Sequence, residues 1–220
     1  MAYKLSPSAL SLMKDCPRCF WLHHNKEKKR PDSIFPSLPS GMDSILKKHF
    51  DKFMEKGKLP PELVGNKECK GCKLFDDVEL LRVWRSNFKG IVVKDKNENV
   101  LHGAIDNLLM KGKKLIVLDY KTRGFPLKED THLHYQNQID IYNFLLRENG
   151  YETEDYAFLL FYYPKEVLET GEVIFNTHLK KMKIDVKNAK NIWKKAIKLL
   201  NDPCPKKHEH SECEWCNWEE

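Results

Sequence analysis

The chain has 220 residues, a net charge of +6 and 41% apolar residues. This composition is ordinary for a soluble globular protein and sufficient for a sizeable core. No stretch approaches the ~20 apolar residues of a membrane helix, and the N-terminal segment lacks the apolar centre of a signal peptide. We therefore expect a cytoplasmic protein that does not contact membranes. Its seven cysteines indicate metal binding or redox chemistry rather than disulfides.

Helices and irregular segments are expected in the N-terminal third of the chain. Apolar residues recur at helical spacing over residues 6–24, after serines that can cap a helix. Three prolines and a glycine make residues 31–41 a loop or linker. A second amphipathic helix is expected from Met42 to Glu55, and residues 57–72 show no periodicity.

The hydrophobic period then changes to that of strands. The remaining expected elements are strands at Ile91–Lys94, Val100–Met110 and Leu115–Tyr120, a helix at 131–148, strands at 155–164 and 172–184, and a helix at 185–200. This order predicts one α/β domain over residues 1–220, in which helices flank a central mixed sheet.

Two acidic residues and a lysine suggest a site at the end of the predicted strands. In VLDYKTR (117–123), Asp119 and Lys121 share one strand face. A hairpin that turns near residue 112 makes Asp106 or its neighbour the partner of Asp119. Paired carboxylates require a neutralising cation, and hard divalent ions prefer oxygen ligands. With a nearby lysine this set suits phosphodiester hydrolysis, although a surface Asp–Lys pair would give the same pattern.

Four short motifs, in order, resemble one nuclease family. HGAIDNLL (102–109), VLDYKTR (117–123) and YQNQIDIY (135–142) resemble motifs II, III and QxxxY of RecB-like PD-(D/E)xK nucleases. LSPSALSLMKDCPRCFWL (5–22) resembles the N-terminal signature of that branch, and the chain is also similar to CRISPR adaptation nucleases and the AddB nuclease domain. The resemblance implies a restriction-endonuclease-like core and a metal-dependent deoxyribonuclease. Its substrate would be single-stranded DNA or duplex ends, with partners in recombination, repair or CRISPR adaptation.

The resemblance also implies roles for individual residues. Asp106 and Asp119 would bind Mg(II) or Mn(II), together with the main-chain carbonyl of Tyr120. Lys121 would position or activate the attacking water. Gln138 and Tyr142, one helical turn apart, would contact DNA or hold that lysine. The alternative for this last pair is the polar edge of a helix packed on the sheet.

One departure from the family pattern concerns a metal-binding histidine. The branch has it four residues after a glycine, whereas here Gly41 is followed at that offset by Ile45. His49, one turn later, is the candidate substitute ligand, and Asp43 and Asp51 are acidic options. A purely structural role for His49 remains equally open.

The cysteines form CxxC pairs near both ends of the chain. Two such pairs can complete a tetrahedral metal site. We predict the ligands Cys16, Cys19, Cys213 and Cys216, with Cys204 in reserve. The resemblance implies a 4Fe-4S cluster that joins the segments 1–40 and 201–220, but the C-terminal cysteine spacing departs from the family pattern. Structural zinc is therefore the alternative.

A third CxxC pair, Cys69 and Cys72, falls in the irregular segment. We expect two free thiols there. The alternative is a metal site completed by Cys204, His208 or His210, although the two histidines are expected in a solvated tail.

Basic residues are concentrated in two places. Eight lysines lie between Lys180 and Lys198 with one acidic residue, and a second group spans residues 26–30. Such patches suit a polyanion, although a solvated surface is the alternative. Trp21 and Trp84 are available for base stacking. The lysines expected to contact DNA are Lys187, Lys190, Lys194 and Lys195.

Overall fold

The computed structural model describes residues 2–31, 36–207 and 213–217. The helices are α1 (Pro7–Asp15), α2 (Pro17–Lys26), α3 (Ser37–Glu55), α4 (Val78–Trp84), α5 (Gln136–Glu148) and α6 (Val186–Asn201). The strands are β1 (Lys4–Leu5), β2 (Cys72–Leu74), β3 (Ile91–Lys94), β4 (Val100–Gly103), β5 (Asn107–Lys111), β6 (Lys114–Thr122), β7 (Tyr156–Val167) and β8 (Val173–Lys183). Short 3-10 turns occur at Lys67–Cys69, Thr131–Tyr135 and Glu214–Asn217.

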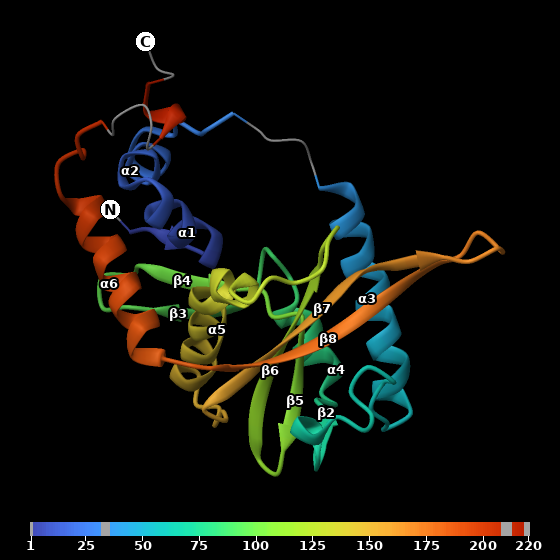
Figure 1. The fold of residues 1–220 in the computed structure, drawn as a ribbon. Coiled ribbons are helices and arrows are strands. Elements are labelled where there is room, and N and C mark those ends of the chain that lie inside the picture. Colours follow the sequence, from blue (N-terminus) through green and yellow to red (C-terminus); the bar gives the residue numbers. More distant parts are fainter. Residues whose placement is uncertain (1, 32–35, 208–212, 218–220) are drawn as a thin grey trace.

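The fold is mixed α/β, with a curled central sheet flanked by helices (Figure 1). The central sheet has the strand order β2-β5-β6-β7-β8, in which β6 and β7 are parallel and the other pairs antiparallel. A smaller sheet has the order β1-β4-β3. The predicted fold class is thus confirmed, with the strands divided between two sheets.

Strand β6 shows how the two faces of the central sheet differ. Val117 belongs to the core formed with α5 and α6, whereas Leu118 and Tyr120 pack in a second core with Phe50 of α3. Alternation along the strand therefore turns Asp119 and Lys121 toward the α5 side. The sequence predicted that these two side chains share one face.

The first predicted helix is two helices. Cys16 has extended dihedral angles (φ −156°, ψ 107°) between α1 and α2, because the residue before a proline disfavours the helical conformation. Ser6 caps α1 by accepting a hydrogen bond from the backbone N–H of Ala9 at 3.2 Å. The break places the Cys16 side chain beside the first turn of α2.

The expected loop at 31–41 is shorter than predicted. Helix α3 begins at Ser37 rather than Met42. Pro39 is tolerated there because amides of the first helical turn have no intrahelical partner. Residues 32–35 lie outside the described part of the chain.

The strand expected over Val100–Met110 is also interrupted. Residues 104–106 separate β4, which pairs with β3, from β5, which pairs with β6. The two halves thus belong to different sheets. Strands β1 and β2 and helix α4 were not predicted from the sequence, because none of them exceeds seven residues.

The two ends of the described chain lie close together. Figure 1 shows the C-terminal turn Glu214–Asn217 against α2, at one end of the molecule. None of the helices within the described residues has the length and apolarity required to cross a membrane.

Candidate active site and cysteine cluster

A cavity of about 510 Å³ lies at the end of β6, on the side of the sheet covered by α5. It contains every residue of the predicted acidic and lysine constellation except His49: Asp106, Asp119, Tyr120, Lys121, Gln138 and Tyr142. Tyr120 contributes its backbone to this surface, because its ring lies in the core on the α3 side of the sheet. There the ring centroids of Tyr120 and Phe50 are 4.7 Å apart.

Asp106 is positioned by the break between β4 and β5. Asn107 pairs with Leu118, so the preceding Asp106 lies beside Asp119. One carboxylate oxygen of Asp106 accepts a hydrogen bond from the backbone N–H of Tyr120 at 3.1 Å. The register expected from the hairpin turn is therefore correct to within one residue.

Arg85, at the end of α4, fixes this break from the other side. Its Nε donates to the main-chain carbonyl of Asp106 at 2.7 Å. Its Nη1 donates to both carboxylate oxygens of Asp51, at 2.8 and 3.0 Å. The guanidinium thus ties α3 to the turn that carries Asp106. Sequence analysis missed Arg85, and no local pattern around it indicates this contact.

Asp119 is almost completely enclosed, with 1% of its surface exposed. Burial raises the pKa of this carboxyl to about 6, although the Lys121 ammonium lowers it. The Nζ atom of Lys121 lies 2.5 Å from Asp119 Oδ2. Asp119 is buried and lies beside a second carboxylate, Asp106. A bound cation would therefore strongly stabilise its ionised form.

Lys121 is held at several points. Its Nζ donates to Gln138 Oε1 at 3.0 Å, and Gln138 Nε2 donates to the Tyr142 hydroxyl at 2.8 Å. The Tyr135 ring centroid lies 4.7 Å from the ammonium. Burial lowers the pKa of Lys121, but Asp119 and Asp106 raise it to a net value above the ordinary one. This net rise in the pKa favours the protonated, cationic form of Lys121.

Helix α3 supplies a second ammonium that the sequence analysis missed. Lys47 Nζ lies 3.0 Å from Asp106 Oδ1 and 2.8 Å from Asp43 Oδ2. Burial lowers the pKa of Lys47, yet these carboxylates raise it above its usual value. The one-turn spacing of Asp43 and Lys47 indicates their ion pair. No local sequence pattern indicates the contact of Lys47 with Asp106.

The structure does not bring His49 to Asp106 or Asp119. Its Nε2 lies 3.0 Å from an oxygen of Glu62, and its ring contacts Phe50 and Phe53. The reason is helical rotation: two positions after Lys47, a side chain points about 200° away around α3. Of the two acidic alternatives, Asp43 lines the cavity and Asp51 binds Arg85.

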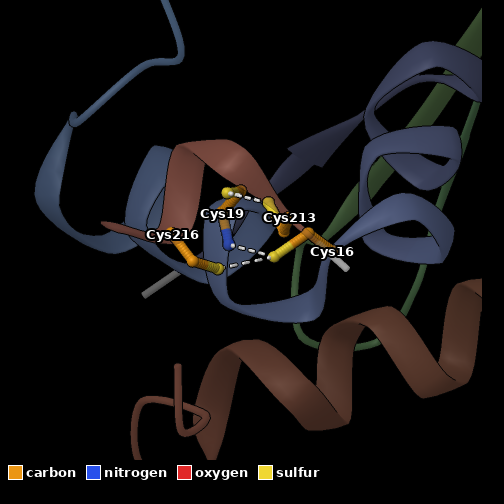
Figure 2. A group of neighbouring side chains, drawn as sticks. All are labelled: Cys16, Cys19, Cys213 and Cys216. Carbon is orange, nitrogen blue, oxygen red and sulfur yellow. Dashed lines mark hydrogen bonds between the residues drawn. The ribbon is translucent and has the colours of Figure 1, made fainter. Parts of the chain in front are cut away.

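The four predicted cysteines form one buried cluster (Figure 2). Cys16 lies at the α1–α2 break, Cys19 in the first turn of α2, and Cys213 and Cys216 at the C-terminal turn. Their sulfur atoms all lie within 4.8 Å of one another, with distances of 3.2 Å from Cys16 to Cys216 and 3.7 Å from Cys19 to Cys213. The arrangement can hold a metal ion.

Electrostatics within the cluster also favour a bound cation. Burial raises the pKa of the Cys19 thiol to about 12, despite a lowering contribution from Arg30. Four thiolates in so small a volume would repel one another unless a metal ion neutralised them.

The remaining cysteines lie apart from this cluster. Cys204, the reserve ligand, accepts a hydrogen bond from Arg18 at 3.2 Å instead. Cys69 is buried in the α3-side core, which raises the pKa of its thiol to about 11. Neither Cys69 nor Cys72 forms a disulfide bond. His208 and His210 lie outside the described residues.

Only one of the two tryptophans proposed for stacking is accessible. Trp84 is buried and stacks on Phe75 at 5.8 Å, because it closes the core under α4. Trp21 is partly exposed, and its indole N–H donates to the Asp202 carbonyl at 2.9 Å. On α6, Lys187, Lys190, Lys194 and Lys195 are exposed, opposite the apolar stripe that packs on α5.

A comparison with known protein families gives the class to which the chain belongs. The PD-(D/E)XK nuclease superfamily model matches residues 72–220, which is more than half of the chain. The chain belongs to this superfamily, whose members are generally nucleases that hydrolyse phosphodiester bonds and typically use divalent metals. The matched segment includes Asp106, Asp119 and Lys121. None of the curated proteins compared with the chain matches it.

Proposed function

We propose that this protein is a Mg(II)- or Mn(II)-dependent DNA nuclease of the RecB-like type. The observation that carries the proposal is the convergence of Asp106, Asp119 and Lys121 on one cavity, at the end of two paired strands. Superfamily membership supports phosphodiester hydrolysis, and the cavity supports a metal-assisted mechanism.

The donor set fits a hard divalent cation. The Asp106 and Asp119 carboxylates, together with the Tyr120 carbonyl, are oxygen ligands of the kind that Mg(II) and Mn(II) prefer. When bound, such an ion polarises the phosphate and lowers the pKa of a coordinated water. Asp119 must be ionised for this, and a cation in the cavity favours that form.

Side chains around Asp106 and Asp119 would position the phosphate and the attacking water. Lys121, which is cationic, neutralises charge on the scissile phosphate and holds the attacking water. Gln138 and Tyr142 keep the ammonium in place through their hydrogen-bond chain. Lys47 balances Asp106 and offers a second positive charge at the cavity wall.

The test is cleavage of labelled single-stranded and duplex DNA with Mg(II) or Mn(II). The parent is compared with Lys121→Ala and with Lys113→Ala, a matched charge loss in the exposed β5–β6 turn. We expect metal-dependent cleavage by the parent and Lys113→Ala, and loss of cleavage with Lys121→Ala. Equal cleavage by all three proteins would contradict the proposed site.

A second candidate function is DNA binding without turnover, as in a scaffold protein. It is favoured by one observation: the ammonium of Lys47, rather than an additional ligand, pairs with Asp106. This candidate predicts salt-sensitive DNA binding and no metal-dependent cleavage by the parent.

For the cysteine cluster we propose a single bound ion, with zinc as the first choice. Tetrahedral Zn–S bonds of ~2.3 Å place sulfur atoms about 3.8 Å apart, a value inside the range of the observed sulfur–sulfur distances, which runs from 3.2 Å to no more than 4.8 Å. In a 4Fe-4S cluster each thiolate binds a different iron, so the sulfurs must lie farther apart. An absorption spectrum with metal analysis of anaerobically purified protein distinguishes the two centres.

The proposed setting is the cytoplasm, with DNA as the partner in recombination, repair or CRISPR adaptation. The exposed lysines at 187, 190, 194 and 195 support DNA binding because they form one positive face of α6.

A further inference from the structure

A second cavity, of about 350 Å³, opens on the same side of the sheet as the candidate active site. Its lining includes residues from the segment after β6 and from β7 and β8: Lys128, His132, Phe161, Tyr163, His178 and Lys180. Of these residues, the sequence analysis considered only Lys180, as the first lysine of the basic stretch 180–198.

This cavity continues the surface of the active site across the sheet. Lys121 pairs with Phe161 of β7, which in turn pairs with His178 of β8. Neighbouring strands lie ~4.8 Å apart, so this row extends roughly 10 Å from the catalytic lysine. Tyr135 stands between the two cavities, near both Lys121 (4.7 Å) and Phe161 (6.0 Å).

The cavity combines positive charge with ring surfaces. Lys128, Lys180 and two imidazoles face a single acidic residue, Glu129. Within the described residues, no carboxylate lies in ion-pair distance of either lysine. The partly exposed ring of Tyr163 lies on the β7 part of the wall.

We propose that this cavity binds a nucleotide that flanks the cleaved bond on the same DNA strand. Lys180 and Lys128 contact its phosphate, and the Tyr163 ring stacks on its base. Cations recognise phosphates irrespective of sequence, and aromatic faces stack on any base. The inference rests on the proposed nuclease function, since it places the scissile phosphate at Asp106 and Asp119.

Strand β8 offers a matched pair of variants for the test. Lys180 and Lys181 are adjacent and therefore point to opposite faces of the sheet. Lys180 lines the cavity, whereas Lys181 pairs with Glu68 at 2.7 Å and lies over the Tyr156 ring. Lys180→Ala and Lys181→Ala remove the same charge from the same strand and differ in the face they affect.

The experiment measures binding of a fluorescein-labelled single-stranded oligonucleotide by anisotropy at several salt concentrations. Both variants are made in the Lys121→Ala background, so that turnover does not interfere. We expect Lys180→Ala to weaken binding at least about threefold and to reduce the salt slope by about 0.7, the value for one lost phosphate contact. Lys181→Ala should stay within about twofold of its background. Equal effects of the two substitutions would overturn the proposal.

A second pair of variants tests the ring. Tyr163→Phe keeps the stacking surface, whereas Tyr163→Ala removes it and should weaken binding about fivefold or more. Binding that Tyr163→Ala leaves unchanged would exclude stacking on this ring.

Failure of this inference is distinguishable from failure of the proposed function. If the parent cleaves DNA with metal but Lys180→Ala binds DNA unchanged, only the proposed flanking-nucleotide site is wrong. If the parent never cleaves DNA but Lys180→Ala still weakens binding selectively, the proposed nuclease function is wrong and the nucleic-acid binding site stands.

Discussion

In the candidate active site, Asp106, Asp119 and Lys121 come from two paired strands and the residue just before the first of them. The cysteine cluster instead joins Cys16 and Cys19 to Cys213 and Cys216, across nearly the whole chain. In the first region the local strand register positions reactive groups on a sheet that other contacts already hold together. In the second, a metal ion bound by the four cysteines would itself close the chain, so that its binding energy would contribute to folding. Substitutions in the two regions should therefore have different consequences.

The largest effect is expected for the cysteine cluster. Cys16→Ala or Cys216→Ala should lose the bound metal and lower the free energy of unfolding by several kcal/mol, because an incomplete site no longer joins the two chain ends. Metal analysis, solubility and thermal unfolding followed by circular dichroism measure these changes.

Cys204→Ser is the control for this prediction, because Cys204 contacts Arg18 outside the cluster. It should retain the metal content and melting temperature of the parent. Cluster variants that stay as stable and as metal-loaded as the parent would contradict the assigned ligand set.

The next largest effect is on chemistry rather than folding. Lys121→Met should reduce the cleavage rate at least about 100-fold, because it removes a preorganised charge from the site. The fold should persist, since Asp119 can take up a proton when its ammonium partner is absent. Single-turnover cleavage and circular dichroism together check this separation; a variant that unfolds like the cysteine variants would break the comparison.

A smaller effect is expected at Arg85. Arg85→Met should lower cleavage about tenfold at limiting Mn(II), with recovery at saturating metal, because Asp106 loses its main-chain anchor. A metal titration of the cleavage rate measures this shift. Arg82→Met, an exposed position on the same helix α4, is the matched control. An unchanged metal dependence for Arg85→Met would remove the positioning role.

The smallest effect is a pH dependence near neutrality. The pKa of Asp119 is raised to about 6 by burial, against the opposing effect of Lys121. The ionised form of Asp119, which is the form proposed to bind metal, therefore predominates above pH 6 and is lost as pH falls through that value. Cleavage at limiting Mn(II) should drop about twofold between pH 8 and pH 6, and the midpoint should move to lower pH with more metal. A midpoint near pH 4 at low metal would show that Asp119 is not desolvated as the structure indicates.

The raised pKa of Asp119 has the opposite effect on folding stability, which should increase as pH falls. Because the pKa of Asp119 is higher in the folded state than in the unfolded chain, proton uptake favours the folded state. The cost of burying this carboxylate is present above pH 6 and is relieved as pH falls.

Local patterns determined much of the candidate site. The two-residue period of a strand placed Asp119 and Lys121 on one face, and counting back from the turn located Asp106 opposite them. The one-turn spacing of Gln138 and Tyr142, and the paired CxxC motifs, were equally readable, because each depends only on positions within one element or motif.

Tertiary structure alone decided the remainder. The division of residues 100–110 between two sheets and the burial of Trp84 follow from long-range packing. The same is true of α3, whose rotation brings Lys47 to Asp106 and turns His49 toward Glu62. A helical pattern shows which side chains share a face but not what that face meets, since the meeting depends on how separate elements pack.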